Sequence, residues 1–301
     1  MLDKNQFTLE QLRTFAATVE CRSFSAAARI LGKAQSAVST AMTNLEIDLG
    51  VELFDRSGKF PVLTDAGVAL LRDAHRILNL AKEMQGRANG LQAGEELQLT
   101  IVIDDFVPVS MLAELFTGFE KEFPYIELEL LFAGLEDATE LIRSGRAQMG
   151  LMIPIDAMEP DLRFDCHQIG TMEYLPVAHV DHPLASMKQI TMDELALHRQ
   201  LVSTGRNITG PLYVKWMHGR QLWRVESHFA IYDLVRTGVG WATLPEHIVK
   251  KSIENGSFVV LDLGFKEVSE QLPFYLIKNK GVIGGKGCQW LTNELTQIVI
   301  E

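Results

Sequence analysis

The sequence predicts two kinds of structure in one chain: a small all-α module at the N-terminus and a larger α/β region after it. In the first ninety residues, apolar side chains recur at helical spacing. From about residue 94, short strand-like runs alternate with helical stretches. Charge divides at the same place: residues 1–90 hold 11 Lys and Arg against 10 Asp and Glu, and the remainder holds 17 against 29.

The composition limits the classes of function. With 301 residues, 47% of them hydrophobic, the chain can form two or three domains with real cores. The acidic C-terminal region argues against a general polyanion binder, but a near-neutral N-terminal module can bind nucleic acid through a local patch. We expect a cytoplasmic protein with no membrane partner, because there is no signal-like N-terminus, no membrane-length apolar run, and only three scattered cysteines, Cys21, Cys166 and Cys288.

Two short helices open the chain. The first is predicted from the spacing of Leu9, Leu12, Phe15, Ala16 and Val19. Ser23 or Ser25 is expected to cap the second, an alanine-rich helix that allows another helix to approach closely. Gly32 then supplies the permissive backbone that a tight turn needs.

The third helix, from about Gln35 to about Leu49, has apolar residues on one stripe and small polar residues on the opposite face. The second helix of a helix-turn-helix unit enters the DNA major groove, where Gln pairs with adenine and Ser or Thr contacts base edges or phosphates. We interpret the polar face as a DNA-reading surface; an ordinary solvated face is the alternative. The polar residues are Gln35, Ser36, Ser39, Thr40 and Thr43, opposite Val38, Met42, Leu45 and Leu49.

The next segment, GVELFDRSGKFPVLTDAG, predicts a small hairpin, or wing, followed by a long helix. Arg56 and Lys59 lie on this wing, where cationic side chains can hold phosphates. Thr64 or Asp65 is expected to cap the helix, which runs over about 66–91. Its apolar residues follow a roughly heptad spacing that one isolated helix cannot bury, so we expect it to pair with a second copy. Packing on the chain's own C-terminal region is the alternative.

The chain resembles the LysR-type transcriptional regulators along its whole length. The motifs that carry the resemblance are FTLEQLRTFAATVECRSFSAAARIL, QSAVSTAMTNLEIDLGVELFDR and LTDAG, in order and correctly spaced. The resemblance implies a winged helix-turn-helix, a linker helix that dimerises, and a C-terminal sensor of two α/β lobes similar to type 2 periplasmic binding proteins. It also implies homodimers or homotetramers on double-stranded promoter DNA, controlled by a small-molecule effector, and it admits RNA polymerase as a further partner.

The resemblance assigns DNA contacts to particular residues. The expected DNA-binding positions are Lys33, Gln35, Ser36, Ser39, Thr40, Thr43, Arg56 and Lys59. Lys33 and Ala34 depart from the family, which usually has a small apolar residue and then Ser before this helix. Ala34 cannot cap the helix, at a cost of about 1 kcal/mol, whereas Lys33 can reach a phosphate. The usual arginines of the recognition helix are missing from STAMTNLE, so affinity should depend on oligomerisation.

The region from about residue 94 predicts parallel sheets covered by helices. LQLTIVI, IELELLFA and QMGLMIPI read as strands with helices between them, and EYLPVAHVDHPLA begins a second series. That series continues through HRQLVST, a helix near PLYVKWMHG, WRVESH, FAIYDLVRTGVG and WATLP. PFYLIKNK and a final helix return to the first lobe, so the chain crosses twice and forms a hinge beside a cleft.

By resemblance, the effector positions lie in this cleft. They are Asp104, Asp105, Phe106, Pro154, Ile155, Ser203, Thr204, Gly205, Arg206, Ser227 and His228. Many family members have Ser or Thr at the position of Asp104, which suits a carboxylate effector. Two Asp side chains repel an anion, which favours a neutral or cationic effector; Arg206 pairing with one Asp would restore neutrality. The alternative is that these acids only cap a helix that begins near Pro108.

No constellation for catalysis is found. The segment GVIGGKG at 281–287 is one residue too short for a phosphate loop and lacks Ser or Thr after Lys286. We therefore expect no enzyme activity, no catalytic residue, no metal site and no cofactor. The second functional hypothesis is a two-lobe small-molecule-binding protein whose N-terminal module serves oligomerisation rather than DNA reading.

The expected domain boundaries follow from these patterns. Residues 1–65 form the winged helix-turn-helix, 66–92 the linker and dimerisation helix, and 93–301 the effector-binding domain. Within that domain, lobe I comprises 93–163 and 268–301, and lobe II comprises 164–267. The effector, the operator, the target genes, the choice between activation and repression, and the choice between dimer and tetramer do not follow from one sequence.

Overall fold

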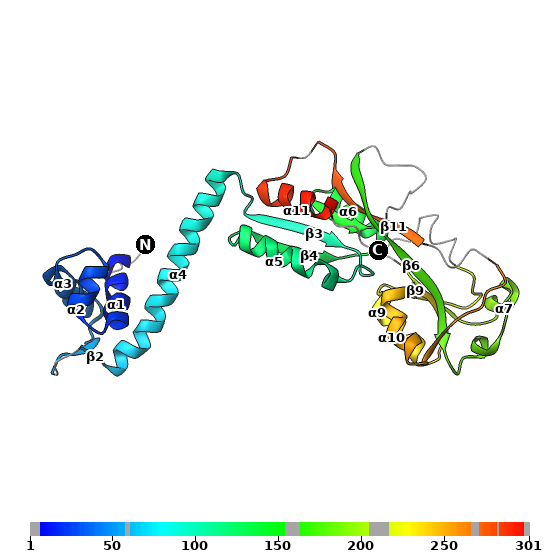
Figure 1. The fold of residues 1–301 in the computed structure, drawn as a ribbon, viewed down its shortest axis with the longest axis horizontal. Coiled ribbons are helices and arrows are strands. Elements are labelled where there is room, and N and C mark those ends of the chain that lie inside the picture. The colour runs from blue at the N-terminus through cyan, green and yellow to red at the C-terminus, as the bar shows by residue number, and fades with distance from the viewer. Residues whose placement is uncertain are drawn as a thin grey trace. The chain divides into compact units, whose positions relative to one another are not determined.

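The computed structural model describes residues 7–57, 61–153, 163–204, 217–265, 271–281 and 283–297. The chain divides into two compact units, Met1–Gln92 and Ala93–Glu301, which are described separately (Figure 1). Five of the expected site residues lie outside the described residues: Lys59, Pro154, Ile155, Gly205 and Arg206. Most of the expected helix near PLYVKWMHG lies outside them as well.

Three helices open the N-terminal unit: α1 (Leu9–Cys21), α2 (Phe24–Ile30) and α3 (Gln35–Leu49). Thr8 begins α1 with a capping box that it shares with Gln11, and the Ser23 hydroxyl caps α2. Gly32 adopts a left-handed φ of +64° between α2 and α3, as the turn requires. Ala34 gives α3 no side-chain cap, which confirms the expected departure.

The predicted hairpin is present as β1 (Phe54–Asp55) and β2 (Val62–Leu63), an antiparallel pair. The Thr64 hydroxyl then accepts a hydrogen bond of 2.9 Å from the Gly67 amide at the start of α4 (Asp65–Ala93). Gly67 lies so close to the preceding chain that a Cβ there would be 2.2 Å from the Leu53 carbonyl oxygen. The glycine of LTDAG therefore lets the long helix begin directly beneath the hairpin.

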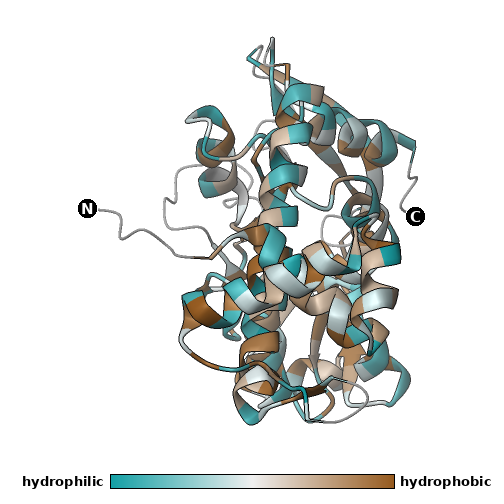
Figure 2. Cartoon of the chain, turned by 90° about the vertical axis from the view of Figure 1, so that its left-hand side faces the viewer, coloured by the Kyte–Doolittle hydropathy of each residue, from teal (hydrophilic) through white to brown (hydrophobic). Residues whose placement is uncertain are grey.

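The N-terminal core is built from the apolar stripes of α1 and α3, the start of the hairpin and the first half of α4. Met42 and Leu45 are fully buried, and the Phe15 and Phe54 rings meet edge to face at 5.6 Å. The helices carry teal and brown residues along their lengths, as amphipathic helices do (Figure 2). The buried stripe fixes which face of α3 is left to solvent.

Lobe I of the C-terminal unit contains the parallel strands β3 (Gln98–Ile103), β4 (Glu127–Phe132) and β5 (Met149–Met152), ordered β4-β3-β5. The connections are η1 (Val109–Leu112) with α5 (Ala113–Glu122), and α6 (Leu135–Arg143). Alternate residues of β3 enter two cores: Ile101 packs with α5 and α11 (Lys286–Gln297), and Val102 packs with α6. The predicted βαβαβ pattern is confirmed.

Two strands join the lobes: β6 (Phe164–His179) and β11 (Gln271–Asn279). The first part of β6 pairs with β11 as far as Glu173, opposite Gln271, and β11 also pairs with β5. From Tyr174, opposite Pro245, β6 pairs with β9 (Trp241–Pro245) of the second lobe. Figure 1 shows β6 running from one lobe into the other. The crossing in β6 therefore lies between Glu173 and Tyr174.

The sequence prediction began the second series at EYLPVAHVDHPLA, and pairing with lobe II does begin there, at Tyr174, but the strand itself starts earlier. The strand begins at Phe164, because its first half completes the sheet of lobe I before its second half enters lobe II. The sequence prediction also missed α7 (Met192–Ala196), α10 (Glu246–Glu254), β10 (Phe258–Val260) and the 3₁₀ turn η2 (Pro183–Ser186). These elements are short, and strand pairing or helix packing stabilises them more than local propensity does.

Lobe II contains β7 (Gln200–Ser203), β8 (Leu222–Val225), β9 and β10, with α9 (His228–Arg236) and α10 on one face and α7 on the other. β7 runs parallel to both β8 and β9, so the carboxyl ends of these strands meet at one edge. The full strand order is β4-β3-β5-β11-β6-β9-β7-β8, with β10 paired to β6. Each lobe therefore has helices on both faces of its sheet, which confirms the two-lobe α/β prediction.

Candidate functional site

The exposed face of α3 carries the residues expected to read DNA. Gln35, Ser36, Thr40 and Thr43 are exposed and Ser39 is half-buried, while the opposite stripe is fully buried at Val38, Met42 and Leu45. The Thr43 hydroxyl donates to the Ser39 carbonyl oxygen over 3.2 Å, which leaves its lone pairs available. The fold therefore presents a small polar surface on one helix, with a rigid core behind it.

Lys33 is already engaged within the module. Its ammonium forms an ion pair with Glu10 of α1, and that hydrogen bond and charge hold the pKa of Glu10 below its usual value. This pair ties the turn before α3 to α1. A DNA phosphate that contacts Lys33 would have to share the ammonium group with Glu10 or displace Glu10 from it.

Arg56 is held by Glu46 of the recognition helix. The guanidinium donates to one Glu46 oxygen over 2.6 Å, and the other oxygen accepts the backbone amides of Leu53 and Phe54 over 2.9 and 3.2 Å. The guanidinium also lies 5.7 Å from the centre of the Phe24 ring. Arg56 thus joins the wing to α3, a role that the sequence prediction did not include.

The long helix α4 has two apolar surfaces. Leu70, Leu71, Ile77 and Leu78 pack against the N-terminal core. Val68, Leu80 and Met84 remain exposed, with relative accessibilities of 47%, 64% and 76%.

A hollow of about 720 Å³ lies between the lobes of the C-terminal unit. It opens where strands end: Asp105 follows β3, Ala133 and Gly134 follow β4, and Thr204 and Glu226 follow β7 and β8. Ligands bind at such carboxyl ends in α/β sheets. The complete lining is Asp105, Leu131, Phe132, Ala133, Gly134, Asp137, Glu140, Leu141, Ser144, Arg146, Thr204, Glu226 and Ser227.

Asp105 of lobe I contacts the first turn of α9 in lobe II. One carboxylate oxygen accepts the His228 backbone amide over 2.8 Å, and the other lies 2.5 Å from His228 Nδ1. Burial acts to raise the pKa of Asp105, but the hydrogen bonds and charge of His228, with a hydrogen bond from Ser227, outweigh it and hold the pKa below its usual value. The side chains of His228 and Asp105 are only 9% and 17% exposed.

For Asp105, this contact argues against the alternative in which the acid only caps the helix near Pro108. Pro108 itself is the N-cap of the short η1, and the Asp105 carboxylate instead accepts a hydrogen bond from His228 in the other lobe. Asp104 is 2% exposed. Burial raises the pKa of Tyr174 well above its usual value, and the negative charges of Asp104 and Asp105 raise it further. Phe106 is buried beside these acids, with its ring edge-on to His228 at 6.2 Å.

The same acids and His228 are the group in the described part of the chain whose geometry could hold a metal ion. One atom from each of Asp104, Asp105 and His228 lies within 4.8 Å of the others. The hydrogen bond to Asp105 uses His228 Nδ1, so that nitrogen already has a partner.

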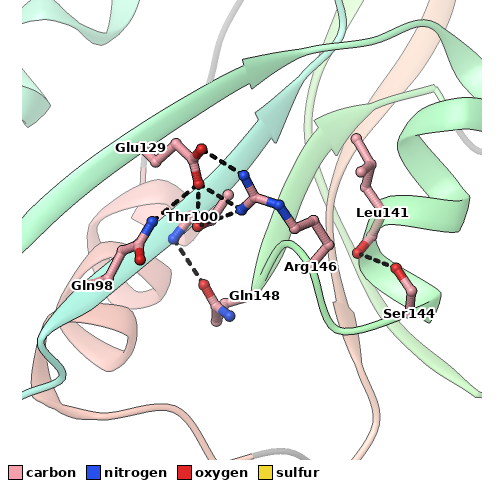
Figure 3. Close-up of polar contacts among 7 residues, drawn as sticks. All are labelled: Gln98, Thr100, Glu129, Leu141, Ser144, Arg146 and Gln148. Carbon is pink, nitrogen blue, oxygen red and sulfur yellow. Dashed lines mark hydrogen bonds and ion pairs between the residues drawn. The ribbon is translucent and has the colours of Figure 1, made fainter.

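The hollow has an acidic rim. Asp105, Asp137, Glu140 and Glu226 all line it. Arg146 lines it too, but donates two hydrogen bonds of 2.5 and 2.6 Å to Glu129 (Figure 3). That pairing, with a hydrogen bond from Thr100, lowers the pKa of Glu129 to about 2. Arg146 is thus paired with a carboxylate outside the lining, and Glu140 of the lining pairs with Arg143; the lining itself holds four carboxylates against one guanidinium.

Sequence reasoning missed much of the lobe I side of this hollow, including Phe132, Gly134, Asp137 and Arg146. It also missed Glu226, while Ser203 is half-buried and does not line the hollow. The rule that ligands bind at strand carboxyl ends would have indicated the residues after IELELLFA, because that strand lies beside LQLTIVI. No sequence rule of this kind indicates that residues of α6 line the hollow.

Comparisons with known proteins agree with this architecture. Residues 9–68 match the model for the bacterial regulatory helix-turn-helix protein of the lysR family, and residues 92–297 match the LysR substrate binding domain. The HTH-type transcriptional regulator AceR of Acinetobacter baumannii is 32% identical over 255 residues, 84% of each chain. The multiple virulence factor regulator MvfR of Pseudomonas aeruginosa is 29% identical, over 84% of this chain and 75% of that protein.

Solved structures share the fold. A Corynebacterium glutamicum OxyR C206 mutant aligns with a TM-score of 0.57 at 22% identity, over 98% of this chain and 94% of that one. CrgA, a LysR-type transcriptional regulator from Neisseria meningitidis, aligns with a TM-score of 0.53 at 21% identity, over 97% and 99%. Within the described residues, no helix is both long and apolar enough to cross a membrane.

The two matches follow the division seen in the structure, with a helix-turn-helix in one unit and a two-lobe ligand-binding fold in the other. They do not favour the alternative of a ligand-binding protein whose N-terminal module only oligomerises. The chain belongs to the LysR family of transcriptional regulators, with a DNA-binding helix-turn-helix and an effector-binding domain.

Proposed function

We propose that this regulator reads double-stranded promoter DNA with the exposed face of α3 and holds phosphates with the turn and wing beside it. The reading residues are Gln35, Ser36, Ser39, Thr40 and Thr43, and the phosphate-holding residues are Lys33, Arg56 and Lys59. The support is the contrast between an exposed polar face and a buried stripe on a single helix. A helix of this kind, following a short turn, enters the major groove with its N-terminal residues at the base edges.

The proposed assembly is a homodimer through the linker helix, and a tetramer on DNA through the effector-binding domains. Exposed Val68, Leu80 and Met84 on α4 support the dimer, because such residues gain stability when a second helix covers them. We place the domain boundaries at 1–65, 66–92 and 93–301. Lobe I then comprises 93–163 and 268–301, and lobe II comprises 164–267.

The effector is proposed to bind between the lobes and to be neutral or cationic. The four carboxylates of the hollow support this choice, because a second anion would be repelled while an ammonium or guanidinium group would be attracted. The effector-binding residues are those expected from the sequence, including Asp104, Asp105, Thr204, Ser227 and His228, together with the lobe I rim. Binding shifts the balance between two lobe arrangements by its differential affinity for them.

We further propose that the protein acts as a regulator and not as an enzyme, works in the cytoplasm, and contacts RNA polymerase when it activates. Membership of the family supports these points.

Fluorescence anisotropy of the full-length protein tests the DNA proposal. DNA from upstream of its own gene is compared with a scrambled sequence at two salt concentrations. Tighter binding to its own upstream DNA at both salts establishes sequence-specific recognition. Equal, weak and strongly salt-dependent binding to both places the operator elsewhere, and no binding at low salt contradicts DNA reading.

A further inference from the structure

We propose that Asp105 is a specificity-determining residue: its carboxylate occupies the carboxylate-binding position of lobe II, ties the two lobes together, and excludes carboxylate effectors. The inference rests on the proposed effector cleft and adds a mechanism for its selectivity. It starts from one contact that joins residues 123 positions apart in the chain.

The partners of Asp105 are those that a free carboxylate ligand would use. The His228 backbone amide at the start of α9 points to one oxygen at 2.8 Å, and His228 Nδ1 lies 2.5 Å from the other. Ser227 supplies a further hydrogen bond, and as the N-cap of α9 it has no side-chain cap bond of its own. An amide at a helix N-terminus, a hydroxyl and an imidazole together satisfy a carboxylate.

The apolar surroundings of this contact make its loss energetically unfavourable. Rings from Phe106 and Tyr174 each lie 6.2 Å from the His228 ring, and both residues are almost fully buried. A charge-assisted hydrogen bond is stronger in such apolar surroundings than in water, and an unpaired partner is correspondingly unfavourable. A carboxylate effector must therefore displace Asp105 and leave a buried charge behind.

The contact also lies beside the crossing between the lobes. Tyr174, whose ring touches His228, is the residue at which β6 changes from lobe I pairing to lobe II pairing. Breaking the Asp105–His228 contact therefore loosens the lobes next to their hinge. A cationic effector has no need to break it, because the hollow has further carboxylates on its lobe I side, Asp137 and Glu140, of which Glu140 pairs with Arg143.

A rescue experiment tests the assignment on the full-length protein. Asp105→Gly removes the carboxylate and leaves room for a formate ion in its place. The melting temperature is measured with increasing sodium formate and, in parallel, with sodium chloride at equal ionic strength. We expect formate to raise the melting temperature of D105G saturably, by roughly 2–4 °C, while formate and chloride act alike on the wild type.

The double variant Asp105→Gly with His228→Gln is the control, because it lacks the imidazole and should lose most of the formate effect. Equal responses to formate and chloride in a folded D105G would overturn the proposal. So would a formate effect that persists undiminished in the double variant, because the ion would then bind elsewhere.

If D105G does not fold, Asp105→Ala with hydrogen exchange replaces it, because alanine has no acceptor for the His228 amide. The His228 amide should be protected in the wild type and exchange at least several-fold faster in D105A, whereas unchanged protection contradicts the contact. Neither measurement contains DNA or an effector. A failure of DNA binding would therefore count against the proposed function without altering this result, and the reverse also holds.

Discussion

Two carboxylates that hold a nitrogen-containing partner, Glu46 and Asp105, are both largely buried, with side-chain exposures of 13% and 17%, but their partners differ. Glu46 and Arg56 are ten residues apart in the N-terminal unit, and the Arg56 side chain is 43% exposed. Asp105 and His228 are 123 residues apart, and neither side chain is more than 17% exposed. The first contact joins a wing to its neighbouring helix, and the second joins two lobes.

The difference shows how distance along the chain and burial set what a polar contact does. The Glu46–Arg56 contact keeps its cation in solvent, so we expect it to lie near the roughly 0–1 kcal/mol of surface pairs and mainly to orient the wing on a core that is already stable. A buried pair that loses one partner costs about 3–5 kcal/mol. The Asp105–His228 contact can therefore bias the lobe arrangement, which is the property that an effector-controlled domain needs.

The largest expected effect comes from breaking the buried contact. Asp105→Ala should lower the stability of the C-terminal unit by about 3 kcal/mol, because the backbone amide and the imidazole of His228 both lose their hydrogen bond to this carboxylate. All four tryptophans lie in this unit, so urea unfolding followed by tryptophan fluorescence reports on it alone.

Asp233→Ala provides the matched control for this measurement. Asp233 lies on the same helix and pairs with Arg236 over 3.3 Å, but both side chains are at least 60% exposed. Its loss should be nearly neutral. Similar unfolding midpoints for the two variants would remove the distinction drawn between buried and exposed pairs.

A second test asks whether the exposed face carries specificity although it contributes little stability. Gln35→Ala should reduce discrimination at one base pair by about 1–3 kcal/mol and leave the melting temperature unchanged. Anisotropy against the operator and its single-base variants measures this change. If specific and random DNA lost affinity equally, Gln35 would be a general contact and not a reading residue.

Salt dependence separates the two cations of the wing. Lys59→Ala should weaken all sequences alike and reduce the salt slope by about one ion. Arg56→Met should reduce the slope by less than K59A does, because Arg56 shares its guanidinium between phosphate and Glu46, and should also lower affinity through the orientation of the wing. An unchanged slope in R56M would show that Arg56 only positions the wing and does not hold phosphate.

The smallest expected effect concerns pH. Hydrogen bonds from Arg146 and Thr100 lower the pKa of Glu129 to about 2, below its usual value of 4.5. The stability from this depressed pKa is present above pH 4.5 and is lost as the pH falls through about 2. The difference in melting temperature between wild type and Glu129→Gln should therefore shrink between pH 6 and pH 3. A difference that grows on acidification would contradict this assignment.

Local patterns accounted for most of the fold. The helices around Gly32, the hairpin after Gly50 and the βαβαβ run of lobe I appear where spacing and turn residues predict them. The first half of β6 was missed because it is defined by pairing with β11, about a hundred residues later. The rim of the hollow was missed for the same reason, since α6 and the residues that follow β8 line it together only when the lobes are assembled.

The sequence by itself determined the family, the polar face of α3, and the α/β character of the C-terminal unit, because periodicity and turn chemistry act over a few residues. Only the tertiary structure decided the partners of the charged residues. Arg56 pairs with Glu46, Lys33 pairs with Glu10, and Asp105 contacts His228 in the other lobe. In the unfolded chain, a charged side chain has many possible partners of opposite charge. Only folding determines which of them lies within hydrogen-bonding distance.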